Sequence, residues 1–382
     1  MKRLFLIVLA VLLLAGAGIA SHAEPQAGEK STVRAACVYH TGSGKFVSEE
    51  NADEKLNVAG LSRLPALVTI AEAVESGKID LLNTTVTVSE KAAREKGPTA
   101  FIEANEIIKA ELLFKSAAMM GAGDAVFALG EMLSGSEDAF LKCVNSLLES
   151  MGIDTVLSSI SGEGSEFSAR ELACLSARLA KCKTYLKYSS LYMDSITHEN
   201  GKETELVNSN RLVRTLNGCI GLSTGSSNDA LYCGTFYTER TECGYICVIL
   251  GAKNSAMRFE KAKEATETAF STYKEIKIAK KGDVIIYDYP IAGAQKKMCE
   301  ITAAADMSVL SANAGEKPKC TYNMPDMLTA PVKCGDVVGN AVYTDADGNI
   351  LCTLELTVNT DINKAGFYDF FKAVLCMWLS AN

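Results

Sequence analysis

The sequence predicts an α+β domain, followed by a small all-β domain and a C-terminal amphipathic helix. Strand signals occur at residues 33–47 and again at 231–251, and the segment between them is rich in helical periodicity. Strands at both ends with helices between them favour a single sheet built from the two ends of the domain. After residue 275 the apolar pattern changes to alternating, β-branched segments, which indicates a second, all-β domain.

The chain begins with a pattern typical of an export signal. Lys2 and Arg3 precede an unbroken apolar run over residues 4–14, and residues 21–23 (Ser-His-Ala) place small residues where a signal peptidase reads them. The apolar run is too short for a comfortable transmembrane span. We therefore expect residues 1–23 to be a signal peptide. An uncleaved membrane anchor is the alternative.

The first predicted domain covers residues 24–274. Two strand-like segments flank the turn at residues 41–44, which predicts a hairpin. Apolar residues at helical spacing then predict a helix from Leu64, with Pro65 tolerated in the first turn. The other expected elements are a short strand over 85–88, helices over 106–120, 124–134, 136–150 and 168–181, strands over 231–238 and 244–251, and a helix over 255–271.

The second predicted domain covers residues 275–359. Its strand signals lie at 283–289, 340–344 and 350–358, and a turn is expected over 345–349. The last predicted segment, residues 360–382, is an amphipathic helix too short to cross a bilayer but able to lie in its interface. The side chains expected to bind the membrane are Phe367, Phe370, Phe371, Val374 and Trp378. Packing of this helix on its own β domain is the alternative.

Charge and composition exclude some classes of partner and cofactor. The net charge is −8 and basic clusters are missing, so a phosphate backbone would be repelled and nucleic acid is not an expected partner. Of three histidines, one falls in the predicted signal peptide, which leaves His40 and His198. That number excludes a three-histidine metal site and leaves few candidates for a Ser-His-Asp triad.

The cysteines give no sign of a metal site either. None of the thirteen forms a C-x-x-C pair, and the closest two are Cys243 and Cys247. Scattered cysteines in apolar segments behave as small core side chains, so we expect mostly free thiols. Disulfides, which export would permit, are the alternative. We expect no metal and no cofactor.

Several short segments, in order along the chain, resemble the low-molecular-weight penicillin-binding proteins, which are serine-type D-alanyl-D-alanine carboxypeptidases. They are NADEKL at 51–56, TVTVSEKA at 85–92, GSEDAF at 135–140, NSNRL at 208–212, RFEKAK at 258–263 and APVKCGDVVG at 330–339. The resemblance implies a β-lactamase/transpeptidase-like first domain, a β-rich second domain and often a terminal membrane-binding helix. It also implies hydrolysis of wall peptides.

Such enzymes use three motifs, S-x-x-K, S-x-N and K-T-G. The first places a serine nucleophile one helical turn from a lysine that takes its proton. The second supplies a proton-relay serine and a substrate-binding asparagine, and the lysine of the third attracts the substrate's terminal carboxylate.

The catalytic side chains are replaced at all five motif positions of this sequence. Gly60 and Arg63 stand at the first motif, Gly121 and Gly123 at the second, and Ser223 at the third, where Thr224 and Gly225 remain as a substrate-binding remnant. Glycine has nothing to acylate, and arginine keeps its proton at physiological pH. The resemblance therefore implies a family member with degenerate motifs.

Two residues beside the first motif allow more than one interpretation. Arg63 is either a cation that binds an acidic ligand in the old cleft, or an arginine used in an internal ion pair or on the surface. Ser62 is two residues beyond the lost nucleophile, which turns it away on a helix, so we expect a capping or solvated serine.

The sequence thus predicts an exported pseudoenzyme at the outer face of the cytoplasmic membrane. We expect it to bind peptidoglycan stem peptides or an envelope protein without hydrolysis. One alternative is an active carboxypeptidase that uses substitute residues. Another is a purely structural interaction module whose old cleft is filled.

Overall fold

The structure is a computed structural model of the 382-residue chain. It describes residues 33–241, 243–311, 317–369 and 371. The predicted signal peptide over residues 1–23 lies outside the described residues.

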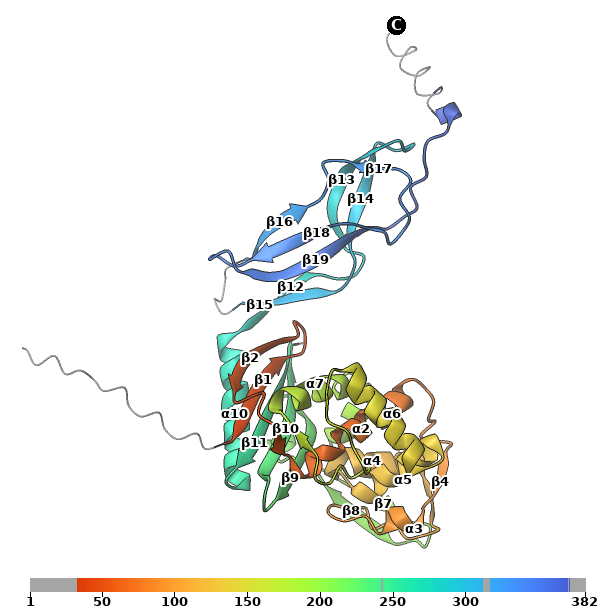
Figure 1. Ribbon diagram of the computed structural model, residues 1–382, viewed down its shortest axis with the longest axis vertical. Coiled ribbons are helices and arrows are strands. Elements are labelled where there is room, and N and C mark those ends of the chain that lie inside the picture. Colours follow the sequence, from red (N-terminus) through yellow and green to blue (C-terminus); the bar gives the residue numbers. More distant parts are fainter. Residues whose placement is uncertain (1–32, 242, 312–316, 370, 372–382) are drawn as a thin grey trace, which may run out of the picture. The chain divides into compact units, whose positions relative to one another are not determined.

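The first domain is built on a five-stranded antiparallel sheet in the order β2-β1-β11-β10-β9. Its strands are β1 (Ala35–His40), β2 (Lys45–Glu50), β9 (Cys219–Ser227), β10 (Leu231–Arg240) and β11 (Cys243–Ala252). Strand β1 pairs with β11, so that Ala35 lies opposite Leu250 and His40 opposite Tyr245. The expected sheet made from both ends of the domain is confirmed (Figure 1).

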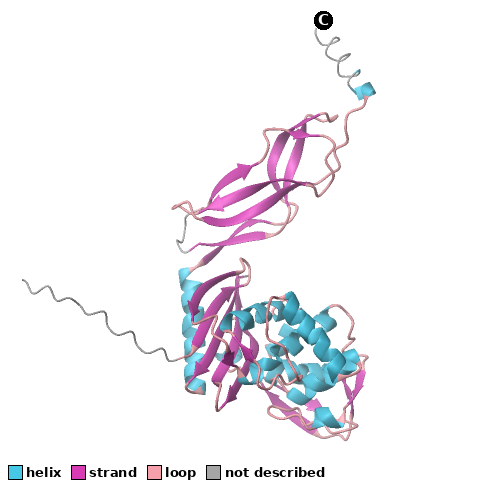
Figure 2. Ribbon diagram, in the orientation of Figure 1, coloured by secondary structure: helices cyan, strands magenta, loops and turns pink. Residues whose placement is uncertain are grey.

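Helices cover both faces of this sheet because its strands are apolar on both sides. Ile246, Val248 and Leu250 of β11 belong to the core shared with the helical layer, whereas Cys247 and Ile249 pack toward α10 (Ser255–Thr272). Figure 2 shows α10 on one side of the sheet and most of the other helices on the opposite side. Those on the opposite side include α2 (Leu64–Glu75), α4 (Ala110–Met120), α5 (Gly123–Ser134), α6 (Glu137–Ser150), α7 (Ala169–Leu179) and α8 (Lys183–Ser189).

Side-chain caps fix where several helices begin. Asn254 accepts the Met257 N–H at the start of α10, and Ser136 accepts the Ala139 N–H at the start of α6. Helix α2 follows directly on a 3-10 turn, η1 (Ala59–Arg63), and carries Pro65 in its first turn. The 3-10 turn η1 contains Gly60 and Arg63, the two residues that the sequence analysis assigned to the first motif.

Short elements complete the first domain. Among them, one sequence prediction is wrong and one hairpin was not predicted. Residues 107–109, expected to begin a helix, form strand β5 (Ile107–Lys109) paired with β4 (Thr85–Thr87). The hairpin of β7 (Met193–Thr197) and β8 (Glu203–Val207) was not predicted. The other short elements are β3 (Leu56–Asn57), α3 (Glu90–Ala93), β6 (Glu166–Phe167) and α9 (Leu212–Thr215).

The second domain is all-β in its described residues, as predicted. A six-stranded sheet runs in the order β16-β18-β19-β14-β13-β17, and β12 pairs with β15 separately. Its apolar core includes Ile301, Ala341, Leu354 and Leu356. The strands are β12 (Lys274–Ala279), β13 (Val284–Ala292), β14 (Met298–Ala303), β15 (Met307–Ser311), β16 (Lys319–Asn323), β17 (Leu328–Thr329), β18 (Val337–Thr344) and β19 (Ile350–Val358).

The terminal helix is described only at its start. Residues 367–369 and 371 are helical, and Phe367 and Phe371 are 86% and 56% exposed. Phe370, Val374 and Trp378 lie outside the residues whose side chains are described. No helix within the described ranges is long and apolar enough to cross a membrane. The twelve cysteines in the same ranges are free thiols.

Candidate active-site cleft

A cleft of about 970 Å³ lies where η1, the end of α4 and strand β9 meet. It is lined by Gly60 and Arg63 of η1, by Gly121 at the end of α4, and by Ser223, Thr224 and Gly225 of β9. The structure therefore brings together three segments that lie far apart in the sequence.

Close backbone approach explains two of the glycines here. A Cβ on Gly225 would lie 2.6 Å from the Gly60 nitrogen, so β9 packs against η1 with no side chain between them. Gly121 ends α4 with a φ of 66°, a left-handed conformation that glycine adopts without strain. A Cβ at that position would face the Ser223 hydroxyl at 3.8 Å.

Arg63 lines the cleft and is largely buried. The residue is 9% exposed, and its Nη2 donates a hydrogen bond to the Lys96 carbonyl at 2.9 Å. The guanidinium lies against Gly123, where a Cβ would be 3.1 Å from Cζ and from Nη2. Thus Arg63 fills the space that a side chain at position 123 would need, and it is not a surface arginine.

The electrostatic surroundings of Arg63 keep it a cation. Burial lowers the pKa of Arg63, while the carboxylates of Glu95, Asp124 and Glu163 act in the opposite direction. A guanidinium stays protonated under such conditions. Its Nε is buried and has no hydrogen-bond partner among the described residues.

The carboxylate of Asp124 accepts hydrogen bonds from backbone N–H groups and not from Arg63. Both of its carboxylate oxygens accept the Ala100 N–H at 2.9 Å, and one accepts its neighbour Ala125 N–H at 2.8 Å. Burial raises the pKa of Asp124, and these backbone hydrogen bonds oppose that rise. The carboxylate thus ties the loop between α3 and β5 to the start of α5.

Several serines line the cleft, and two of them, Ser62 and Ser223, bear on the motif assignments. Ser62 is 4% exposed, and its hydroxyl lies 2.8 Å from the carbonyls of both Ala59 and Ser161. It is therefore a buried structural hydroxyl, and the interpretation of a capping or solvated serine is wrong. Ser223 lines the cleft beside Thr224.

Three further arginines line the cleft, and the sequence analysis assigned none of them a role. Arg258 donates from Nη1 to the carbonyls of Gly225 at 3.1 Å and Cys233 at 2.9 Å. Burial lowers its pKa to about 10, and its Nε also lacks a partner among the described residues. The others are Arg211 and the exposed Arg94. Arg211 and Arg258 lie in segments that carry the family resemblance, which was their only signal in the sequence.

Comparisons with known proteins agree with this architecture. The family model described as D-alanyl-D-alanine carboxypeptidase matches residues 21–254. A second model, described as the penicillin-binding protein 5 C-terminal domain, matches residues 273–364. The chain is 27% identical over 351 residues to the D-alanyl-D-alanine carboxypeptidase DacF of Bacillus subtilis, with 90% of each chain covered. It is 24% identical to DacC of Escherichia coli, covering 89% of this chain and 87% of the relative.

Solved structures show the same fold at lower identity. Penicillin-binding protein 5 from Haemophilus influenzae superposes with a TM-score of 0.78 at 21% identity, covering 88% of this chain and 99% of that one. PBP3 from Streptococcus pneumoniae gives 0.70 at 20% identity, covering 87% and 99%. The β-lactamase/transpeptidase-like fold expected from the resemblance is thereby confirmed. The chain belongs to the D-alanyl-D-alanine carboxypeptidase family of low-molecular-weight penicillin-binding proteins.

Proposed function

We propose that this family member does not hydrolyse wall peptides but binds their carboxylate termini in its cleft. The observation that carries the proposal is the placement of Arg63. Arg63 lines the cleft, and its guanidinium lies against Gly123.

Loss of chemistry follows from the side chains in the cleft. Position 60 has no oxygen to acylate, because it is glycine. Arg63 cannot take a proton from a nucleophile, because its guanidinium is already protonated. Ser62 does not replace the nucleophile, since its hydroxyl is bound to two backbone carbonyls. These residues leave no pair of a nucleophile and an adjacent base at the first motif.

Binding is favoured by the same residues. Arg63, Arg211 and Arg258 line the cleft, and arginine recognises a carboxylate through charge-assisted hydrogen bonds. Ser223 and Thr224 add hydroxyl groups on the strand that lines the cleft. The cleft is also open, which supports binding over the alternative of a structural module with a filled cleft.

Export and membrane attachment are part of the proposal. The residues proposed for them, 1–23 and most of 360–382, lie outside the described structure, and Phe367 and Phe371 at its edge are exposed. Removal of residues 361–382 should release the protein from membranes, whereas high salt should not, because Asp361 and Asp369 balance Lys364 and Lys372. Cell fractionation measures both. Release by salt alone would contradict a hydrophobic attachment.

The decisive experiment measures binding and turnover together. Purified protein is titrated calorimetrically with a pentapeptide ending in D-Ala-D-Ala and with the same peptide amidated at its C-terminus. We expect only the free carboxylate to bind, and Arg63→Ala to weaken binding at least tenfold, about 1.4 kcal/mol. Arg94→Ala is the matched control, because Arg94 is an exposed arginine at the rim of the same cleft.

Each alternative function has its own outcome. D-alanine release from the pentapeptide would identify an active carboxypeptidase with substitute residues. Binding of neither peptide would favour the structural module, with an envelope protein as its partner.

A further inference from the structure

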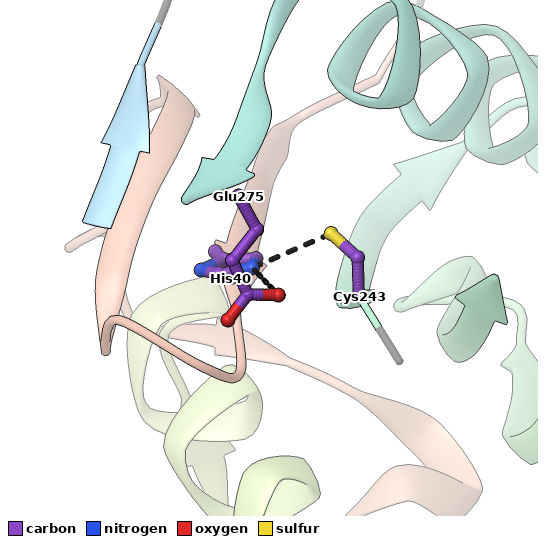
Figure 3. A group of neighbouring side chains, drawn as sticks. All are labelled: His40, Cys243 and Glu275. Atoms are coloured by element: carbon purple, nitrogen blue, oxygen red, sulfur yellow. Dashed lines mark hydrogen bonds and ion pairs between the residues drawn. The ribbon is translucent and has the colours of Figure 1, made fainter. Parts of the chain in front are cut away.

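Three side chains capable of binding a metal meet away from the cleft, at the start of the second domain. His40 is the last residue of β1, Cys243 the first of β11, and Glu275 lies near the start of β12. Figure 3 shows the three pointing toward one another from three different strands. We call them the three-strand cluster. Their donor atoms all lie within 4.8 Å of one another.

Two of the three spacings match the edges of a coordination tetrahedron. The Nε2 of His40 lies 3.5 Å from Sγ of Cys243 and 3.5 Å from Oε2 of Glu275. Zinc bonds of about 2.0–2.2 Å to nitrogen or oxygen and 2.3 Å to sulfur, at tetrahedral angles, give edges of about 3.4–3.6 Å. The third spacing, between Cys243 and Glu275, is within 4.8 Å.

The surrounding residues leave room for the cluster. Gly42, in the turn after β1, has no side chain. A Cβ there would lie 2.5 Å from Oε1 of Glu275 and 3.0 Å from Cε1 of His40. Glycine at this position thus lets the carboxylate reach the imidazole.

An aromatic ring lies beside the cluster. Tyr245 pairs with His40 across the sheet, and their ring centroids are 5.0 Å apart. Its hydroxyl is buried and lies beside the Cys243 thiol. The side chain of Tyr245 is therefore next to two of the three members of the cluster.

The hydrogen bonds of the metal-free cluster are incomplete. Nδ1 of His40 accepts the Ser43 backbone N–H at 3.0 Å, which leaves the single ring proton on Nε2. Cys243 and Glu275 both face that one proton. A divalent cation bound at Nε2 would interact with the sulfur of Cys243 and the carboxylate of Glu275 together. A single proton has to be shared between these two acceptors.

We propose that His40, Cys243 and Glu275 form a binding site for one zinc ion, with water as its fourth ligand. Imidazole, thiolate and carboxylate are the three ligand types that zinc takes in proteins. The ion would join the first hairpin and the far end of β11 to the first strand of the β-rich domain. Three protein ligands and an open position also leave the ion able to accept a further ligand.

Binding of one zinc ion should release one proton from the cluster. The pKa of Cys243 is raised to about 11, chiefly by burial, so the metal-free thiol is protonated at neutral pH. Burial lowers the pKa of His40, against the effect of Glu275, so the imidazole is neutral and ready to bind. Zinc displaces the thiol proton to solvent. The ring proton moves to Nδ1, where the Ser43 hydroxyl at 2.9 Å accepts it, and the Ser43 N–H loses its acceptor.

The test titrates the chelator-treated full chain with Co²⁺ as a spectroscopic substitute and then with Zn²⁺. We expect one equivalent to bind, a thiolate-to-cobalt charge-transfer band, and release of one proton per ion in weakly buffered solution. Cys243→Ser should weaken binding at least 100-fold and abolish the band. Cys143→Ser is the matched control, because Cys143 is an exposed thiol on α6, and it should change nothing.

A second variant covers the case in which Cys243→Ser fails to fold. Glu275→Gln keeps the size of the side chain and removes its charge, and should weaken binding at least tenfold while the band persists. Failure of the natural chain to bind one equivalent would overturn the proposal. So would a band that survives in a folded Cys243→Ser protein, since another cysteine would then be the ligand.

Discussion

The cleft and the three-strand cluster relate to the sequence in opposite ways. In the cleft, Gly60, Gly121 and Ser223 are the residues that the family's motif spacing predicts, and under the proposed function they lack the side chains of an active enzyme. In the cluster no motif is present, since His40 and Cys243 are 203 residues apart, yet three metal-binding side chains converge. The comparison teaches that motif spacing reports ancestry, whereas side chains in contact report chemistry.

The largest expected effect concerns acylation in the cleft. We expect no covalent adduct after incubation with a fluorescent penicillin, and none for Gly60→Ser alone, because nucleophile, base and carboxylate anchor act as a unit. Joint restoration with Arg63→Lys, Gly121→Ser, Gly123→Asn and Ser223→Lys is the smallest change expected to give an adduct. Intact-protein mass spectrometry measures each case. A stoichiometric adduct on the natural sequence would show that the cleft kept its chemistry.

The pH dependence of metal binding sharpens the other side of the comparison. Below its pKa of about 11 the Cys243 thiol binds a proton that the ion must displace. The apparent affinity should therefore rise about tenfold per pH unit between about pH 7 and 9. Cobalt titrations at several pH values give this slope. It should persist in Cys143→Ser, and a flat profile would mean that no thiol proton is displaced.

A smaller effect tests whether Arg63 depends on Gly123. Gly123→Asn should lower the free energy of unfolding by about 1–3 kcal/mol, because its Cβ would press on the guanidinium at 3.1 Å. Most of this loss should disappear in an Arg63→Ala background. Urea denaturation of the natural protein, the two single variants and the double variant measures the coupling between the two positions in a double-mutant cycle.

Gly135→Asn provides the control for that cycle. Gly135 ends α5 in open space at a φ of 82°, a conformation that asparagine tolerates. It should show no coupling to Arg63. If Gly123→Asn lowered the free energy of unfolding equally with and without the Arg63 side chain, the two positions would be energetically independent, and the prediction would be wrong.

The smallest expected effect concerns the serine that lies beside the lost nucleophile. Ser62→Ala should destabilise the protein by about 1 kcal/mol, because a buried hydroxyl bound to two carbonyls is removed. Peptide binding should not change. Ser271→Ala, at an exposed serine near the end of α10, should be neutral within about 0.5 kcal/mol. Loss of peptide binding in Ser62→Ala alone would assign Ser62 a role in the cleft.

The sequence predicted elements whose periodicity is unambiguous. The first hairpin, α2 and the β10–β11 pair appear within a few residues of their expected bounds. Strand β5 was missed because Ile107 and Ile108 continue the apolar pattern of α4, and only pairing with β4 separates them. The β7–β8 hairpin was missed because its exposed positions are mostly polar and give a weak strand signal.

The side-chain arrangement of the cleft could be predicted only in part. The comparison with the family's motifs singled out Gly60, Arg63 and Ser223, and all three line the cleft. The contact of Arg63 with Gly123 depends on the direction of a long flexible side chain. The three-strand cluster gave no signal at all. Its ligands come from strands that meet only through sheet pairing and the chain's return after α10.

The pairing of β1 with β11 has a consequence for the order in which the chain folds. Strand β1 is made early in synthesis, but its partner follows about two hundred residues later. The helices between them can form on local contacts, whereas the central sheet must wait for the end of the domain. Because His40 and Cys243 sit on these two strands, a cobalt signal from the cluster would appear only when that late pairing is complete. The appearance of the cobalt signal would then report when β1 pairs with β11.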